Sequence, residues 1–347
     1  MAPPNARTRF FYTALAAALL AYGVVVINAY TRLSDAGPNY TVWLDQQSRQ
    51  PAPAIAEDIN SVHKPFAILD YNDGPWELRV HPFLMAALAV LILRLGYLGW
   101  GLAQHKGGRH LVFPIIIFVL LFTLVLPDIT RASLQHQLST RMVQLAGTLS
   151  ILTLLWWLVM REQRFWKSVE ETPLTRVLRP RVIVAFVIVV VQSVLGGWSN
   201  VSQAGLPCAD FPTCQGVWWP AMDFTEVFSN TGYVIDVSSG EASNPSVLTL
   251  HMLHRLGAMI TLLYVGWLAM YVFLACIEGN LCRYGLFVLI LLVSQVCLGI
   301  MAVVTYLPLA TTLAHSAVSA FLLLSILTLY HVVRPPGTAT RRSKKRT

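Results

Sequence analysis

The sequence predicts an all-α polytopic membrane protein with eight transmembrane helices, arranged as two pseudo-repeated four-helix bundles. Three observations lead to this fold class: charge is scarce, eight stretches are long and apolar, and one motif occurs twice. Of the 347 residues, 55% are hydrophobic and only 12% are charged, and the mean hydropathy is +0.58. Soluble domains carry about 25% charged residues, because water has to solvate their surface. The composition therefore excludes a soluble multi-domain protein.

Eight apolar stretches are long enough to cross a bilayer, whose core of about 30 Å requires roughly 20 residues of helix. Each should be helical, because a spanning segment has to satisfy its own backbone hydrogen bonds. The third and fifth stretches are the shortest, and the third contains Pro114. We expect the spans at 10–30, 79–103, 110–127, 138–160, 182–198, 248–274, 284–305 and 309–333.

The distribution of Lys and Arg orients these spans. With the N-terminus in the cytoplasm, 18 of the 25 Lys and Arg residues fall on the cytoplasmic side and 7 do not. This is the positive-inside bias of membrane proteins. It accounts for the net charge of +8 without a nucleic-acid partner. We expect both termini to be cytoplasmic.

A motif recurs at the outer ends of the first and fifth spans. Residues 28–37 read NAYTRLSDAG and residues 196–205 read GGWSNVSQAG, and an offset of 168 aligns Ser34 with Ser202. Four spans separate the copies, so the two halves have parallel topology and are related by an axis along the membrane normal. The alternative is chance similarity between two loops. We expect an N-terminal half at 1–160, a basic cytoplasmic linker at 161–181, a C-terminal half at 182–333 and a basic cytoplasmic tail at 334–347.

Histidines occur at equal predicted depths in the sixth and eighth spans. His254 and His315 each lie six residues beyond the outer start of their span, about 9 Å into the membrane. Ionisable side chains at such depth usually face the bundle interior and have a function. Two facing imidazoles are the axial ligands that a six-coordinate heme iron requires. The alternatives are a hydrogen-bonded intramembrane histidine, which is also our interpretation of His251, and close helix packing by neighbouring small residues.

The duplication predicts a second pair of ligands in the N-terminal half. His81 begins the run HPFLMAALAVLI, which parallels the run HRLGAMITLLYV that begins at His254. The expected partner position holds Gln144, and the nearest histidine, His136, lies about two turns earlier. By this pattern the C-terminal site is complete and the N-terminal site is not.

Long runs of the sequence resemble the heme A synthase family. They are the NAYTRLSDAG motif, LGGWSNVSQAGLPCADFPTCQGVWWPAMDF (195–224), LHMLHRLGA (250–258) and LPLATTLAHSA (307–317). The resemblance covers nearly the whole chain. It implies an enzyme of a bacterial inner membrane that oxidises a methyl group of heme O to the formyl group of heme A for terminal oxidase biogenesis. Heme O synthase or a terminal oxidase would then be candidate partners.

The resemblance also implies site residues. It implies a b-type heme between His254 and His315, and a substrate heme near His81 in the other half. Cys208 and Cys214 correspond to an external cysteine pair, for which a structural disulfide is expected and a redox-active dithiol is the alternative. Trp218 and Trp219 nearby suggest a folded cap over the heme edge. The remaining cysteines, for which we expect no mate and no role, are Cys276, Cys282 and Cys297.

The N-terminal half departs from the family pattern around His81. The family's glutamate should lie three residues before this histidine, where Leu78 stands with Glu77 one step away, and Pro82 replaces the usual arginine. Gln144 stands where the second ligand is expected. We expect His81 to bind the substrate heme from one side, with Gln144 donating a hydrogen bond on the other.

Two functions remain open from the sequence. In the first, an active synthase uses His81 and Glu77 as catalytic residues, with Gln144 and His136 as candidate contacts to the substrate heme. The alternative for Glu77 is an exposed carboxylate at the end of a loop near Arg79. In the second, a non-catalytic relative binds heme b and acts as a heme carrier, an oxidase-assembly factor or a membrane electron carrier.

Overall fold

The computed structural model describes residues 4–34, 76–106, 109–129, 137–162, 172–202, 204–205, 208, 210–229, 245–275, 280–305 and 307–335. Within these residues the regular structure is helical, and the one β-bridge joins Cys214 to Val217. The helices are α1 (Pro4–Ser34), α3 (Trp76–Lys106), α4 (Arg109–Ile129), α5 (Gln137–Glu162), α6 (Pro173–Val201), α7 (Phe224–Ser229), α8 (Pro245–Ala275), α9 (Asn280–Val304) and α10 (Leu309–Val333).

The eight long helices correspond in order to the eight predicted spans. In the described part of the chain, seven of them are long and apolar enough to cross a membrane. The eighth, α4, has a shorter described apolar stretch at Val112–Phe122. The predicted fold class, an all-α polytopic membrane protein, is confirmed.

Helix α6 begins nine residues earlier than the span predicted at 182–198. Thr172 caps its N-terminus: its hydroxyl accepts from the Thr175 backbone N–H at 3.2 Å, and the Thr175 hydroxyl accepts from the Thr172 N–H at 3.0 Å. Pro173 at the first helical position fits this arrangement. The range expected to be a linker, 161–181, is therefore helical from Pro173 onward, and residues 163–171 lie outside the described residues.

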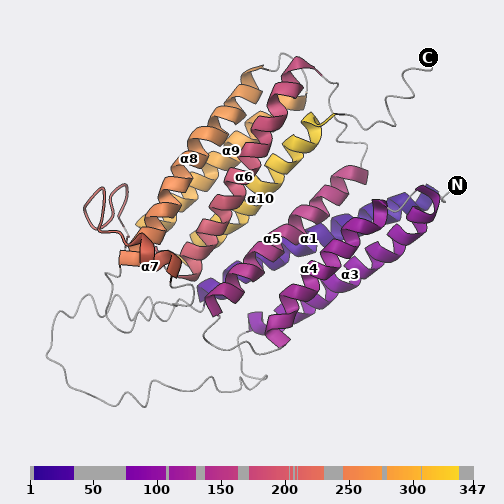
Figure 1. The fold of residues 1–347 in the computed structure, drawn as a ribbon, viewed down its shortest axis with the longest axis horizontal. Helices are drawn as coiled ribbons and strands as arrows, with labels where there is room; N and C mark the ends of the chain where they lie inside the picture. The colour runs from indigo at the N-terminus through magenta and orange to yellow at the C-terminus, as the bar shows by residue number, and fades with distance from the viewer. Residues whose placement is uncertain are drawn as a thin grey trace.

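Two groups of four helices lie side by side in Figure 1. Helices α1, α3, α4 and α5 contact one another in a ring, and α6, α8, α9 and α10 form a second ring in the same order. Helices α1 and α5 contact α10 and α6 across the boundary. Helix α1 corresponds to α6 and α5 corresponds to α10 in the two rings. Each contact across the boundary therefore has an equivalent when the two halves are interchanged, as expected for a duplicated chain. In Figure 1, α1 begins and α10 ends at the upper right, and α7 lies at the lower left.

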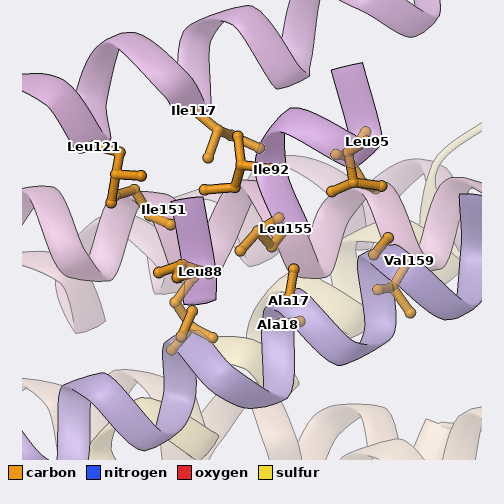
Figure 2. Packing of buried hydrophobic residues seen from close by; sticks show 14 of the residues in the cluster. Ala17, Ala18, Leu88, Ile92, Leu95, Ile117, Leu121, Ile151, Leu155 and Val159 are labelled. Carbon is orange, nitrogen blue, oxygen red and sulfur yellow. The ribbon is translucent and has the colours of Figure 1, made fainter. Parts of the chain in front are cut away.

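The N-terminal bundle has a largely apolar centre, in which side chains of α1, α3, α4 and α5 converge (Figure 2). On α3, Leu88, Ile92 and Leu95 are fully buried at helical spacing, whereas Leu93 and Tyr97 on the other face are exposed. Apolar side chains therefore cover both the inner and the outer face of the helix. This pattern is typical of a helix whose outer face contacts lipid rather than water.

Small side chains let α1 lie close to its neighbours. Ala14, Ala17, Ala18 and Ala21 are all fully buried and form two small-xxx-small pairs. Small residues at this spacing let helix backbones approach each other in membranes, where packing rather than water exclusion drives association. Helix α1 accordingly contacts both α3 and α5, and also α10 of the other bundle.

Candidate functional site

His254 on α8 and His315 on α10 face each other inside the C-terminal bundle. Their ring centres lie 6.5 Å apart and their planes cross at 83°. A nitrogen that binds a metal ion lies about 2 Å from it, and the centre of the imidazole ring lies roughly 1.1 Å further away. The ring centres of two imidazoles on opposite sides of one metal ion would therefore lie about 6 Å apart. The observed separation is therefore close to that of two imidazoles that bind one metal ion.

Glycines on the neighbouring helices leave room for both rings. A Cβ atom added at Gly196 on α6 would lie 2.9 Å from Cε1 of His254. A Cβ atom at Gly299 on α9 would lie 2.8 Å from Cε1 of His315. Both approaches are shorter than real Cβ contacts, so any other residue would push the ring out of position.

Glutamines one turn before these glycines hold the imidazoles. The amide nitrogen of Gln192 lies 2.9 Å from Nδ1 of His254, and it also donates to the His254 carbonyl at 3.0 Å. Nδ1 of His315 lies 3.0 Å from the Gln295 carbonyl oxygen, and Nε2 lies 3.1 Å from the Gln295 amide nitrogen. Both glutamine Oε1 atoms are buried without a hydrogen-bond partner in the described part of the chain.

The sequence reasoning missed these two glutamines, although a signal was present. Gln192 to Gly196 reads QSVLG and Gln295 to Gly299 reads QVCLG, so the same pattern Q-x-x-L-G occurs in α6 and α9. This repeat relates two helices of the C-terminal half, whereas the duplication of the chain relates its two halves. Together, the paired imidazoles, the glycine spaces and the unpartnered amide oxygens fit a flat, metal-containing ligand held between α8 and α10.

His251 lies one turn before His254 and is 4% exposed. Neither ring nitrogen has a hydrogen-bond partner among the described residues. The interpretation of His251 as a hydrogen-bonded histidine is therefore wrong for the described structure. Its ring lies near Gly205. A Cβ atom added at Gly205 would lie 3.7 Å from Cε1 of His251 and 3.1 Å from the Leu307 side chain. The side chain thus fills space where α8 meets two loops.

Arg255 attaches the outer loop to α8, directly after His254. Its guanidinium donates to the backbone carbonyls of Cys208 at 2.8 Å, Asp210 at 2.7 Å and Thr213 at 2.7 Å. Such bonds from a charged donor are stronger than those between neutral groups. The position of the loop is therefore coupled to the helix that carries His254.

The predicted disulfide between Cys208 and Cys214 is confirmed. Both cysteines are fully buried and pack against Leu248 and Met252 of α8. The bonded pair therefore belongs to the packed base of the loop.

Trp218 and Trp219 are 72% and 63% exposed on the surface of the loop. Tryptophans at such positions are typical of the membrane–water interface. Their expected place over the heme edge stays a prediction.

The other cysteines differ from one another. Cys282 is disulfide-bonded, which corrects the expectation that it has no mate. Cys297 is an exposed free thiol, and Cys276 lies outside the described residues.

Asp210 stabilises the tight turn that follows the disulfide. Its carboxylate accepts hydrogen bonds from the Thr213 hydroxyl and from the backbone N–H groups of Gln215 and Gly216. Gln215 and Gly216 both have positive φ, at 54° and 75°, as a tight hairpin turn requires. Partial burial raises the pKa of Asp210, but the hydrogen bonds outweigh burial and lower this pKa to about 2.

The predicted N-terminal site residues lie on two helices of the first bundle. His81 on α3 and Gln144 on α5 are half-buried. His81 shares the helical stripe of the buried Leu88, and Gln144 shares that of the buried Ile151. Helices α3 and α5 occupy the places in the first ring that α8 and α10 occupy in the second.

The other two N-terminal residues are only partly described. Glu77 lies on α3 one turn before His81, and the structure describes its backbone but not its side chain. His136 lies outside the described residues.

Comparisons with known proteins agree with this architecture. The chain matches the COX15-CtaA family model, described as cytochrome oxidase assembly protein, over residues 11–327. It is similar to a protein of Shewanella oneidensis named Heme A synthase, with 27% identity over 321 residues, 92% of this chain and 95% of that protein. Because the family model spans most of its length, the chain belongs to the cytochrome oxidase assembly protein family.

Proposed function

We propose that this protein is a membrane oxidoreductase of heme A biosynthesis, which oxidises the methyl group of heme O to the formyl group of heme A. Family membership and the name of the Shewanella relative support this proposal. The observation that carries it is the pair of facing imidazoles, His254 and His315, with ring centres 6.5 Å apart.

In this proposal His254 and His315 would hold heme b between α8 and α10. Bound there, the heme supplies one-electron transfer. Gly196 and Gly299 keep both imidazole rings in position. The surrounding bundle excludes water, since buried apolar side chains of α6, α8, α9 and α10 form one continuous cluster below the pair.

The substrate heme O would bind in the N-terminal half through His81. With water as the oxygen source, conversion of a methyl to a formyl group releases four electrons and four protons, and the electrons would pass to an external electron acceptor. A proton acceptor is therefore needed beside the substrate. Glu77 is suited to this role, because it lies one helical turn before His81 on α3 and residues at i and i+4 share a face. Gln144 would donate a hydrogen bond from α5, and His136 remains a second candidate contact.

The two sites would communicate across the contact between α5 and α6. Gly197, next to Gly196, packs against Leu145, next to Gln144; a Cβ atom at Gly197 would collide with the Leu145 side chain. The α6 backbone beside the C-terminal site thus lies against Leu145, the residue next to Gln144 of the proposed N-terminal site. This is the route by which electrons would pass between the halves.

The proposed setting is a bacterial inner membrane with both termini in the cytoplasm. Three arginines at the same end of the bundles support this orientation, because cationic and aromatic side chains gather at membrane interfaces. Each stacks on an aromatic ring: Arg161 on Phe113 at 5.3 Å, Arg181 on Trp267 at 5.2 Å and Arg334 on Trp157 at 5.0 Å. Heme O synthase and a terminal oxidase are the proposed partners.

The test is expression in a host that makes heme O, followed by pigment extraction and chromatography. We expect heme A from the wild type, none from His81→Ala, and normal heme b in both. Phe83→Ala is the matched control, since Phe83 lies two residues further along α3 and is exposed. Undiminished heme A from His81→Ala would contradict the proposed substrate site.

One observation favours the second candidate function, a non-catalytic heme b-binding relative. The N-terminal half has Gln144 where the C-terminal half has its second imidazole. Such a protein would yield heme b but no heme A, and it would lose heme b on His254→Ala or His315→Ala. A wild type without any heme would contradict both functions.

A further inference from the structure

The two facing imidazoles are held by equivalent glutamines in different ways. Gln192 and Gln295 begin the same Q-x-x-L-G pattern on α6 and α9, the long helices that precede α8 and α10 in the chain. Each glutamine contacts the histidine of the long helix that follows. The difference lies in which glutamine atom faces Nδ1 of the ring.

A backbone group fixes the proton of His315. Nδ1 of His315 lies 3.0 Å from the carbonyl oxygen of Gln295. A carbonyl oxygen only accepts, so Nδ1 carries the ring proton. A neutral imidazole has one N–H, so Nε2 keeps its lone pair, which accepts from the Gln295 amide nitrogen at 3.1 Å and would have to leave that amide to bind a metal. This arrangement does not depend on the side chain at position 295.

A side chain alone faces the corresponding atom of His254. Nδ1 lies 2.9 Å from the amide nitrogen of Gln192. In this arrangement the amide donates to Nδ1, and the ring proton is on Nε2. For Nε2 to bind a metal, the proton must move to Nδ1 and meet an acceptor there.

Gln192 itself can provide that acceptor. Its Oε1 is buried without a hydrogen-bond partner among the described residues, beside Gly257, where a Cβ atom would collide with it. Turning the amide would bring Oε1 to Nδ1 and release the amide nitrogen from the His254 carbonyl. An amide side chain has both a donor and an acceptor end, so it can serve either tautomer.

We propose that Gln192 is a positioning residue that selects the ring tautomer of His254 and sets how strongly this ligand donates to iron, so that it tunes the redox potential of the bound heme. The inference rests on the proposed heme b between His254 and His315. Partners of this kind orient metal-bound histidines and raise their basicity, and removing them typically weakens metal binding 10- to 100-fold.

The expected effects of substitution have opposite signs. A carboxylate in Gln192→Glu would attract the Nδ1 proton more strongly, make His254 more basic and favour ferric iron. Gln192→Leu removes the acceptor and favours ferrous iron. We expect about a tenfold change in the preference between oxidation states in each case, which is about 59 mV for a one-electron couple.

The experiment is a redox titration of the purified, heme-containing full-length protein, followed by the optical spectrum of the heme. Gln192→Glu should lower the midpoint potential and Gln192→Leu should raise it. Gln295→Leu should shift it less, because the acceptor for His315 is a backbone carbonyl. Ser193→Ala should leave it unchanged, because this hydroxyl bonds to Val189 and Ser319 instead.

The outcomes separate this inference from the proposed function. A wild type without a redox-active heme would refute the proposed site itself. If the wild type titrates normally, a midpoint potential that is unchanged or raised in Gln192→Glu overturns the role of Gln192. A shift in Gln295→Leu as large as that in Gln192→Leu also overturns it. If Gln192→Leu does not retain heme, the nearly isosteric Gln192→Glu still decides by the sign of its shift.

Discussion

Arg255 and Asp210 are the two charged residues that organise the outer loop beside the paired histidines. Arg255 binds four loop carbonyls from the helix side, and Asp210 binds two backbone N–H groups and a hydroxyl from within the loop. Hydrogen bonds to charged groups contribute about 1.5–3 kcal/mol each, and solvent screening makes the contribution smaller at the exposed bonds that Asp210 accepts from Gln215 and Gly216. The loop is therefore held by specific charges as well as by its disulfide.

Acid should loosen this loop through Asp210. Its pKa is about 2 in the folded protein, against an ordinary value of 3.8. The carboxylate therefore stabilises the loop fully above about pH 4, and this stabilisation is lost as the pH falls towards 2. We expect Asp210→Asn to speed reduction of the Cys208–Cys214 disulfide by a phosphine reductant at pH 7. The difference from wild type should shrink below pH 4, and equal rates at pH 7 would contradict this role.

At the scale of elements, α6 and α9 act as supports for the ligand-bearing helices α8 and α10. Each support presents a glutamine and, one turn later, a glycine to the imidazole of the next helix. Side-chain rings are usually fixed by packing against other side chains. Here each ring lies against bare backbone, which leaves it little freedom to shift without moving a whole helix.

Adding one methyl group to either glycine should weaken heme binding. In Gly196→Ala and Gly299→Ala the new Cβ would lie under 3.0 Å from its histidine ring, so the ring has to move. We expect heme affinity to fall at least about tenfold, measured as heme retained per purified protein. Gly266→Ala on α8 is the control, because its Cβ would meet Leu292 at an ordinary 3.5 Å. Equal heme content in all three variants would refute the supporting role.

At the scale of the whole molecule, polar side chains contact the opposite bundle at the boundary between the two halves. The Trp156 indole N–H donates to the Thr328 hydroxyl at 2.9 Å, and the Tyr22 hydroxyl donates to the Ala317 carbonyl at 3.3 Å. Both contacts end on α10, which packs against α1 and α5 of the first bundle. Helix α10 therefore carries a histidine of the C-terminal site and also forms much of the boundary between the halves.

Trp156→Phe should weaken this boundary modestly. Interhelical hydrogen bonds in membrane proteins contribute about 0.6 kcal/mol on average and up to about 1.7. We expect a loss of that size in the free energy of unfolding, measured in detergent or bicelles. Trp100→Phe is the matched control, since Trp100 is mostly exposed on α3. A control effect as large as that of Trp156→Phe would show that the hydrogen bond is unimportant.

The sequence predicted the number and order of the spans, because length and hydropathy alone decide which segments cross a bilayer. It also predicted that His254 and His315 meet, since equal depth on two inward-facing helices brings side chains together. Element ends were less predictable. The early start of α6 depends on the local cap formed by Thr172 and Thr175, which hydropathy does not register.

The parts of the site that escaped prediction depend on relations between helices. Gln192 and Gln295 are ordinary polar residues in sequence, and their role depends on the rings placed beside them. The burial of His251 and the exposure of Trp218 and Trp219 depend on the path of a loop. Loop paths are set by contacts such as those of Arg255, which spacing along the chain does not show.

The most direct test of the account is the ligation of the heme in the C-terminal bundle, measured by electron paramagnetic resonance of the purified ferric protein. We expect a low-spin signal with two imidazole ligands, retained in His81→Ala. The signal should be lost or converted to high spin in both His254→Ala and His315→Ala. A two-imidazole signal that survives either of these last substitutions would contradict the account.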